Sequence, residues 1–412
     1  MALNKYILFL LLVSFQGVFA QETIKTMFYN VFDFPSAPPS NRPELLKNIL
    51  NTYQPDIFMI CELENEFGAD LILNNSLNST STTYSRAPYF DNQSGNAELQ
   101  QLIFYKSEKF TLAAIDIITT TVRDINRYRL LLHTDDQSTN PLYLDIYVTH
   151  LKSSTGTSNQ QLRLQMVTQL TNYLAAIDSD SYVIFAGDLN VYSASEPAYQ
   201  HLLDPDNSIT FADPIDAPGS WNNNASFSYL HTQSTRLSSS GFGGGAGGGL
   251  DDRFDFILIS ENMLDNPEMM YVENSYKAYG NNSNCFNDRI DSPDCNGVFE
   301  QSLRDNLYLM SDHLPVVMEL QTDRTLSTST IAFLEPITFP KGTITSDVLE
   351  LKVSNEIKNQ LDFHIYNVLG QQIKTIYNSN TQQVNIDVSG VAPGIYYLKV
   401  SPYNKTYKFI KR

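Results

Sequence analysis

Two hydrophobic patterns alternate along the first three quarters of the chain. Residues 42–52 and 160–176 repeat their apolar positions at the spacing of an amphipathic helix. The other pattern is a dense run of β-branched and aromatic residues, typical of a buried strand, at residues 23–32, 55–63, 99–106, 142–151, 181–190, 253–260 and 313–320. Strands alternating with helices predict an α/β domain with at least one extensive sheet.

The pattern changes near residue 333. From there to residue 412, short strand-like runs follow one another with turn residues between them, at residues 348–355, 361–370, 371–378, 384–390, 394–402 and 405–412. Strands at this spacing predict a small all-β sandwich of about 80 residues. The polar stretch 322–332 is predicted to be a linker, so the α/β domain is expected to span residues 21–321.

The first twenty residues are expected to belong to neither domain. Lys5 precedes an apolar run over residues 6–15, and small residues follow before Gln21. Such a run is too short to cross a bilayer but has the form of a secretory signal. We therefore predict a signal peptide over residues 1–20, cleaved after Ala20. No other apolar run reaches about 18 residues, so we expect no membrane span in the mature protein.

Two stretches of the α/β domain have the composition of insertions. Residues 74–96 are rich in Asn, Ser and Thr, and residues 238–252 are dominated by glycine. A glycine-rich stretch can cradle phosphate, but this one matches neither a P-loop nor a dinucleotide fingerprint. The composition instead favours a flexible loop at the rim of an active site.

The three cysteines fit an exported protein. Cys285 and Cys295 lie in one polar loop, where an oxidising compartment favours a local disulfide. Metal binding is the weaker interpretation because no His or further Cys lies nearby. Cys61, within an apolar run, is expected to be an ordinary buried thiol.

The charge is unevenly distributed. The whole chain has a net charge of −18, but residues 21–330 contain 17 Lys and Arg against 39 Asp and Glu, a net charge of −22. This is a poor electrostatic match for long DNA, because DNA binding depends mainly on neutralising phosphates. Any anionic substrate would need local help, for which a divalent cation is the simplest source.

Polar residues recur at or near the ends of six predicted strands. Each has an ordinary structural explanation as a cap or turn residue, and for any one of them that explanation is the more common. Their repetition favours function, because ligands of α/β proteins bind at strand ends. The residues are Asn30, Glu62, His150, Asp188, Asn190, Asp255, Asp312 and His313.

Three of these residues suit a metal ion. Glu62 and Asp312 are hard oxygen donors, and with Asn30 they favour Mg²⁺ or Mn²⁺ over zinc.

The other five suit hydrolysis. His150 and His313 can move or donate protons near neutral pH, and an acid such as Asp255 beside an imidazole would fix its tautomer. Asp188 and Asn190 could orient a water and stabilise a developing oxyanion. Together these groups describe the hydrolysis of a phosphate ester.

Five motifs occur in an order that resembles the endonuclease/exonuclease/phosphatase superfamily, to which deoxyribonuclease I belongs. They are "PDIFMICEL", "YVTHLKS", "FAGDLNVY", "RFDFIL" and "SDHLPV", and the resemblance covers roughly residues 21–320. "GDLN" and "SDH" are weak alone, but five ordered motifs are specific. The resemblance implies a four-layer α/β sandwich, in which two packed mixed sheets are flanked by helices.

The resemblance also implies roles for single residues. Glu62 matches the metal-binding glutamate, with Asn30 and Asp312 near the same ion, which would be Mg²⁺ or Mn²⁺, with Ca²⁺ possible. Cys61 departs from the Gln that many relatives carry before that glutamate.

Catalytic roles follow in the same way. Asp188 and Asn190 match the pair that positions the attacking water and the scissile phosphate. His313, paired with Asp255, matches the histidine that activates water or holds the phosphate. His150 matches the histidine that steadies the transition state or protonates the leaving oxygen.

An arginine that contacts the phosphate is also implied by the resemblance. Arg127 is the first candidate for substrate binding, and Arg123 or Arg129 could take its place.

The C-terminal unit resembles a second family, the type A sorting domain of type IX secretion. "FHIYNVLGQQI", "IDVSGVAPGIYYLKV" and the ending "FIKR" carry the similarity over residues 333–412, although the usual Asn-Pro opening is missing. The resemblance implies the type IX secretion machinery as a partner, and a secreted or surface location in a Gram-negative bacterium. An immunoglobulin-like binding module is the alternative.

These observations predict an exported, divalent-metal-dependent phosphodiesterase, with a monomeric nuclease acting on nucleic acid as the first hypothesis. The same chemistry on a phospholipid head group, as in a sphingomyelinase, or on a phosphomonoester is the second. An inactive surface adhesin is the third. The sequence leaves open DNA or RNA, and endonuclease or exonuclease action.

Overall fold

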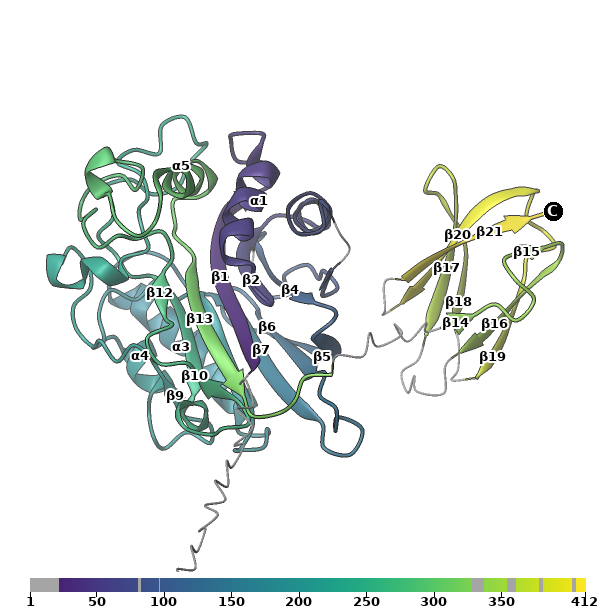
Figure 1. Ribbon diagram of the computed structural model, residues 1–412, viewed down its shortest axis with the longest axis horizontal. Coiled ribbons are helices and arrows are strands. Elements are labelled where there is room, and N and C mark those ends of the chain that lie inside the picture. Colours follow the sequence, from purple (N-terminus) through teal and green to yellow (C-terminus); the bar gives the residue numbers. More distant parts are fainter. Residues whose placement is uncertain are drawn as a thin grey trace, which may run out of the picture.

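The computed structural model describes residues 22–80, 83–95, 97–327, 337–353, 361–377, 381–401 and 405–412 (Figure 1). The predicted signal peptide and residues 328–332 of the predicted linker lie outside this range. Within the described residues, no helix has the length and apolar character needed to cross a membrane.

The α/β domain contains two mixed sheets, as predicted. The first has the order β11-β13-β1-β2-β4-β3, with β12 also paired to β13. Its strands are β1 (Glu22–Phe34), β2 (Ile57–Leu63), β3 (Tyr84–Arg86), β4 (Gln100–Lys106), β11 (Met270–Tyr271), β12 (Lys277–Ala278) and β13 (Val316–Thr322). The second has the order β5-β6-β7-β8-β10-β9. Its strands are β5 (Phe110–Ile118), β6 (Ile125–Leu132), β7 (Leu142–His150), β8 (Tyr182–Asp188), β9 (Phe211–Ala212) and β10 (Asp255–Ser260).

The two sheets pack face to face, and helices cover their outer faces, which confirms the four-layer sandwich (Figure 1). The α-helices are α1 (Arg42–Tyr53), α2 (Glu66–Leu71), α3 (Thr157–Leu174), α4 (Pro197–Leu202) and α5 (Gln301–Met310). The π-helix is η1 (Ile72–Leu77), and the 3₁₀-helices are η2 (Ala225–Leu230), η3 (Glu261–Leu264) and η4 (Pro293–Cys295). Helices α1 and α5 pack on the first sheet, and α3 and α4 pack on the second.

Strand β8 shows how the sequence builds the layers. Successive side chains of a strand point to opposite faces of its sheet. Ile184 and Ala186 therefore join the core between the sheets, while Val183 and Phe185 pack against α3 and α4. All four are buried, so β8 is apolar on both faces and carries its first polar side chain at its end, Asp188.

The structure adds elements that the pattern did not predict. Residues 74–96, expected to be an insertion, include part of η1 and the edge strand β3. Strands β5 and β6 fill a region without a predicted element, and the apolar residues 307–310 end helix α5.

The C-terminal unit is all-β, as predicted, and all six predicted runs contain a strand. One sheet has the order β14-β16-β19 and the other β15-β21-β20-β17-β18. Both contribute to one core that includes Leu351, Phe363 and Leu398. The strands are β14 (Ile337–Thr338), β15 (Ile344–Thr345), β16 (Val348–Val353), β17 (Asp362–Asn367), β18 (Gln372–Tyr377), β19 (Gln383–Asp387), β20 (Gly394–Ser401) and β21 (Lys405–Lys411).

The first part of the predicted linker packs on the α/β domain. Thr322 is the last residue of β13, and Arg324 forms ion pairs with Asp136 and Glu268. Leu326 is buried and bridges to Thr134.

Candidate active site

The ends of six strands meet at one edge of the two sheets. In the second sheet, the register places His150 of β7 beside Asp188 of β8, and Asp188 beside Asp255 of β10. In the first sheet, Asn30 near the end of β1 lies beside Cys61 of β2, one residue before Glu62. The strand ends predicted from the sequence therefore converge.

Asn30 lies at the centre of the group. Its Nδ2 atom donates to Glu62 Oε1 at 2.8 Å and to Asp188 Oδ2 at 3.1 Å, and lies 3.3 Å from His313 Nε2. The backbone of Asn30 is linked to the segment that contains His313 through Ser311. The Ser311 hydroxyl donates to the Asn30 carbonyl oxygen at 2.7 Å and accepts from the backbone N–H of His313 at 3.1 Å. The Ser-Asp-His motif is thus tied directly to the end of β1.

His313 is held from behind by Asp255. The two residues share a hydrogen bond of 2.7 Å between Nδ1 and Oδ2, and both are buried. This bond leaves Nε2 facing Asp188, whose Oδ2 lies 3.8 Å away. The predicted pairing of His313 with Asp255 is therefore present in the structure.

Gln233 is a member of the group that sequence reasoning missed. Its Nε2 atom lies 2.6 Å from His313 Nε2 and 3.4 Å from Asp312 Oδ2. Its backbone also bridges to Asp252 and to His313. Gln233 lies in an irregular segment, so the strand-end rule could not identify it.

Asp312 is bound to the glycine-rich stretch. Its Oδ2 atom accepts a hydrogen bond of 2.6 Å from the backbone N–H of Ala246, and its buried Oδ1 atom has no hydrogen-bond partner in the described part of the chain. A Cβ atom on Gly245, which has a φ of +85°, would lie 2.8 Å from Oδ2. Only glycine lets the loop backbone come this close to the carboxylate.

The same stretch is anchored by an aromatic residue. The Arg236 guanidinium lies 3.7 Å from the centre of the Phe242 ring, and Phe242 packs edge-on against Tyr308 of α5. The glycine-rich residues therefore rest on the rim of the site, where the sequence predicted a loop.

His150 and Asn190 border the group on the second sheet. The two ring nitrogens of His150 lie 3.8 Å from Glu62 Oε1 and 3.6 Å from Asp188 Oδ2. The backbone N–H of Asn190 donates to Asp188 Oδ1 at 3.1 Å, and its side chain donates to the Leu151 carbonyl at 3.4 Å. Both residues are placed where they can contact a group bound at Asp188.

Backbone strain gathers at these strand ends. Glu62 has a φ of 61° and Asn190 a φ of 52°, while Phe32 and Asp33 have φ values of 40° and 41°. Such values cost about 1–3 kcal/mol for a residue with a side chain and are typical of functional sites.

Burial and mutual repulsion disturb the acids of the site. Burial and the nearby charge of Asp312 raise the pKa of Glu62 to about 7. Burial and the nearby charge of Asp255 raise the pKa of Asp188 to about 8. Burial opposes the charged form of His313, but Asp255, Asp312 and Asp188 outweigh it and raise its pKa well above its usual value.

His150 is disturbed in the opposite direction. Burial, the cations Arg123 and Lys152, and a charged His313 lower the pKa of His150 far below its ordinary value. The two histidines are therefore expected to differ in charge at neutral pH.

The group fits a divalent cation. Single ligand atoms of Glu62, Asp188 and His313 all lie within 4.8 Å of one another, and carboxylates with an imidazole suit Mn²⁺, while the two carboxylates suit Mg²⁺. This set shares only Glu62 with the predicted ligands Asn30, Glu62 and Asp312. Asn30 turns its amide nitrogen toward the carboxylates, and Asp312 is bonded to the loop.

We expect metal affinity to rise with pH. Near neutral pH, Glu62 and Asp188 hold protons because their pKa values are raised to about 7 and about 8, and a cation must displace these protons. Calorimetric titration with Mn²⁺ should show tighter binding at pH 8.5 than at pH 6.5, with release of protons to the buffer. Binding that is independent of pH would contradict this assignment of the ligands.

Arg127 is not brought to the centre. Its guanidinium donates to Asp145 at 2.8 Å and to Asp116 at 2.7 Å, and its Nη1 atom bonds to Tyr173 of α3 at 3.2 Å. Arg129 lies 3.8 Å from the same Asp145. Both arginines are thus engaged with Asp145.

Arg123, the remaining candidate, lies at the edge of the site. It precedes β6, and its Nη1 atom donates to the carbonyl oxygens of His150 at 3.4 Å and Leu151 at 3.2 Å. Of the three arginines considered from the sequence, Arg123 is the one that contacts the site.

Cys285 and Cys295 are placed at disulfide-bonding distance, with their Cα atoms 5.2 Å apart, and Cys61 is a buried free cysteine. The loop of the pair is joined to the rim, because the backbone N–H of Leu250 donates to the Asp288 carbonyl at 3.0 Å.

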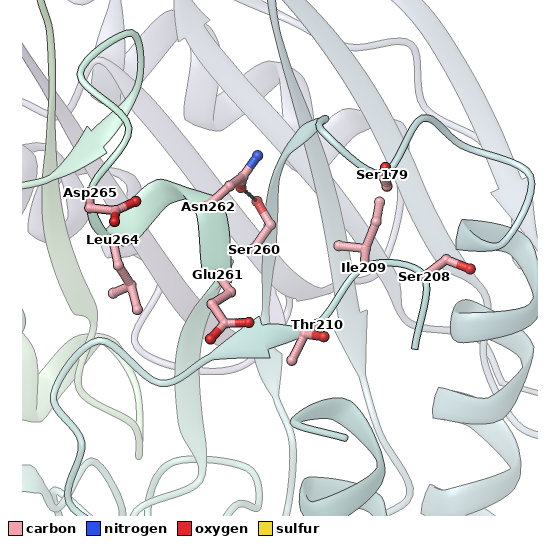
Figure 2. Close-up of a pocket in the computed structure, with 9 residues that line it drawn as sticks. All are labelled: Ser179, Ser208, Ile209, Thr210, Ser260, Glu261, Asn262, Leu264 and Asp265. Carbon is pink, nitrogen blue, oxygen red and sulfur yellow. Dashed lines mark hydrogen bonds between the residues drawn. The ribbon is translucent and has the colours of Figure 1, made fainter. Parts of the chain in front are cut away.

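A surface pocket lies at the other end of the second sheet (Figure 2). Ser260, the last residue of β10, and Ser179, which precedes β8, line it together with Glu261 and Asn262. None of the predicted site residues lines this pocket, so it is separate from the convergent group.

Comparisons with known proteins identify the family. Residues 27–328 match the model of the Endonuclease/Exonuclease/phosphatase family, and residues 345–412 match that of the secretion system C-terminal sorting domain. No curated protein gave a match.

Several solved structures are similar. The human nocturnin catalytic domain with bound sulfate is 17% identical, with a TM-score of 0.46, and the match covers 73% of this chain and 98% of that one. Zebrafish (D. rerio) TDP2 with a single-strand DNA product is 17% identical, with a TM-score of 0.47 and coverage of 73% and 99%. A mannosyl-6-phosphatase from Bacteroides thetaiotaomicron is 14% identical, with a TM-score of 0.44 and coverage of 72% and 99%.

The two family matches agree with the two units of the fold. The C-terminal unit is a sorting domain, as the sequence predicted, and it implies export to the cell surface or the medium. The match of residues 27–328 spans most of the chain and includes all the convergent residues. The chain therefore belongs to the endonuclease/exonuclease/phosphatase family, whose members are metal-dependent phosphoesterases.

Proposed function

We propose that this protein is an exported, divalent-metal-dependent phosphodiesterase that hydrolyses nucleic acid. The observation that carries the proposal is the convergence of ligand atoms from Glu62, Asp188 and His313 within 4.8 Å, with Asp255 behind the imidazole. Export would follow removal of residues 1–20 after Ala20, and the Cys285–Cys295 pair would be oxidised in the outer compartment.

Glu62 and Asp188 would hold the cation, Mg²⁺ or Mn²⁺, beside His313. The cation would neutralise charge on the phosphate. Asp188 and Asn190 would orient the attacking water, and Asp188 would accept its proton.

The two histidines would act differently. A raised pKa keeps His313 charged, and Asp255 fixes its ring, so Nε2–H can bind a phosphate oxygen. A strongly lowered pKa keeps His150 neutral, so it would donate a hydrogen bond to the phosphate rather than protonate the leaving oxygen.

A substrate panel tests the proposal. The mature protein with Mg²⁺ or Mn²⁺ should cleave short DNA or RNA oligonucleotides faster than sphingomyelin or a simple phosphomonoester, and EDTA should abolish the activity. Faster turnover of the lipid or the monoester would overturn the assignment to nucleic acid. Undiminished activity in EDTA would overturn the metal dependence.

A further inference from the structure

Charge is distributed unequally along the rim of the second sheet. At the site end, the strand order places Arg123 before β6, Lys152 after β7, Asp188 at the end of β8 and Asp252 before β10. Neighbouring strands lie about 4.8 Å apart, so the two cations lie to one side of Asp188 and Asp252 lies to the other.

Arg123 and Lys152 have no acidic partner among the described residues. Arg123 donates to the carbonyl oxygens of His150 and Leu151, and its buried Nε atom has no hydrogen-bond partner within the described part of the chain. Lys152 Nζ donates to the Ser153 carbonyl at 2.9 Å. The acid next in sequence, Asp124, accepts instead from the backbone N–H of Gln93 at 2.7 Å. Two unneutralised cations are notable in a domain of net charge −22.

The two cations lie close to each other and to the site. Burial, followed by Arg123 and Arg163, lowers the pKa of Lys152, so the three positive charges repel one another. Arg163 is neutralised by Glu196, at 2.7 Å, but Arg123 and Lys152 are not. The positive field beside His150 is therefore open to an anion.

The side of the site next to β10 is acidic rather than basic. Asp251 and Asp252 are only partly buried, and Asn222 donates to Asp252 at 2.8 Å. The arginines of this region are engaged, because Arg253 is paired with Asp213 at 2.8 Å and Arg236 donates to the Tyr308 carbonyl at 3.0 Å. A phosphate on this side would meet carboxylates without a free cation.

We infer that the substrate carries a second phosphate on one side only of the scissile phosphate, where Arg123 and Lys152 bind it, and an uncharged hydroxylated group on the side of Asp252. This inference rests on the proposed function and narrows its substrate class to short or terminal phosphodiesters. A long polyanion passing through the site would be repelled on the Asp252 side, in agreement with the acidic domain.

Three dinucleotides of one sequence test the inference: one with only the internal phosphodiester, one with an added 5′ phosphate and one with an added 3′ phosphate. We expect one phosphorylated isomer to be cleaved with a kcat/KM roughly tenfold above the unphosphorylated compound, and the other to gain nothing. Lys152→Met should lose this gain and leave cleavage of the unphosphorylated compound within about twofold, whereas Arg123→Met, which also removes a contact to the site, should lose the gain whatever its effect on basal cleavage.

Lys109→Met is the matched control. Lys109 lies near Asp56 at the far end of β2, and Lys106 still pairs with Asp56 after the change. The inference would be overturned if both isomers gained equally, if neither gained, or if the gain persisted in both Lys152→Met and Arg123→Met. If no dinucleotide is cleaved, the substrate panel still decides the proposed function. The inference is then decided by equilibrium binding of the same three compounds with Mn²⁺ present, where one phosphorylated isomer should bind roughly tenfold tighter than the unphosphorylated compound.

Discussion

Asp188→Asn is expected to lower the rate of phosphodiester hydrolysis by about 10³-fold or more at saturating Mg²⁺. The carboxylate belongs to the convergent group, lies beside Glu62 and His313, and is the proposed acceptor of the water proton. Asparagine keeps the shape and the oxygen that accepts from Asn190, but it loses the charge and the basicity. Single-turnover hydrolysis with enzyme in excess would measure the chemical step.

The same variant should be more stable than the wild type when metal is absent. The folded-state pKa of Asp188, about 8, lies above its ordinary value of 3.8, so the buried carboxyl costs stability increasingly as pH rises from 3.8 to about 8, and the cost is fully present at higher pH. Asp188→Asn removes this cost, and its Tm at pH 8.5 in EDTA should exceed that of the wild type by roughly 2–4 °C or more. Asp180→Asn, an exposed change before β8, is the control for both measurements. A fully active variant, or a Tm below that of the wild type, would contradict this account of Asp188.

The second large effect is expected for the His313–Asp255 pair. His313→Gln and Asp255→Asn should each lower kcat by about 10²–10⁴-fold, because Asp255 fixes the ring and supports its charge through their 2.7 Å hydrogen bond. Since the two residues act as a unit, the double variant should be little worse than the worse single variant. Steady-state kinetics of the four proteins would show this as a large coupling. Independent, multiplicative losses would contradict the pairing.

The central strands of the fold could be predicted because they are buried on both faces. Strands such as β8 lie between the facing sheet and the helices, so they are continuously apolar, and their boundaries stand out. Strand β6 was not predicted, because it contains Arg127 and Arg129, which read as polar loop residues. Arg127 is buried there only because Asp116 and Asp145 of the neighbouring strands neutralise it.

Helix α5 shows a different limit. The sequence pattern predicts no element at residues 307–310, yet Leu303, Leu307 and Met310 bury one face of a helix against the first sheet. A run of a few apolar residues is too short to show whether its apolar positions follow the period of a helix or of a strand.

Most of the residues of the candidate site could be named from the sequence, because a polar residue at the end of an apolar strand stands out, and the structure brings these residues to one edge of the sheets. The failures concern contacts that do not follow from strand order. Gln233 reaches His313 from an irregular segment, and Asp312 is bonded by Ala246 of the glycine-rich stretch. Among the three arginines, Arg127 and Arg129 lie within β6 and are held by Asp145, whereas Arg123 lies before the strand and contacts the site.

The most direct test of the account is to titrate metal-stripped protein with Mn²⁺ while following both metal binding and phosphodiester hydrolysis. The account predicts no activity without metal, a half-saturating Mn²⁺ concentration for hydrolysis that equals the Kd for binding, and loss of both in Glu62→Gln. Hydrolysis by the stripped protein, or unchanged Mn²⁺ binding in Glu62→Gln, would contradict a metal-dependent centre built on Glu62 and Asp188.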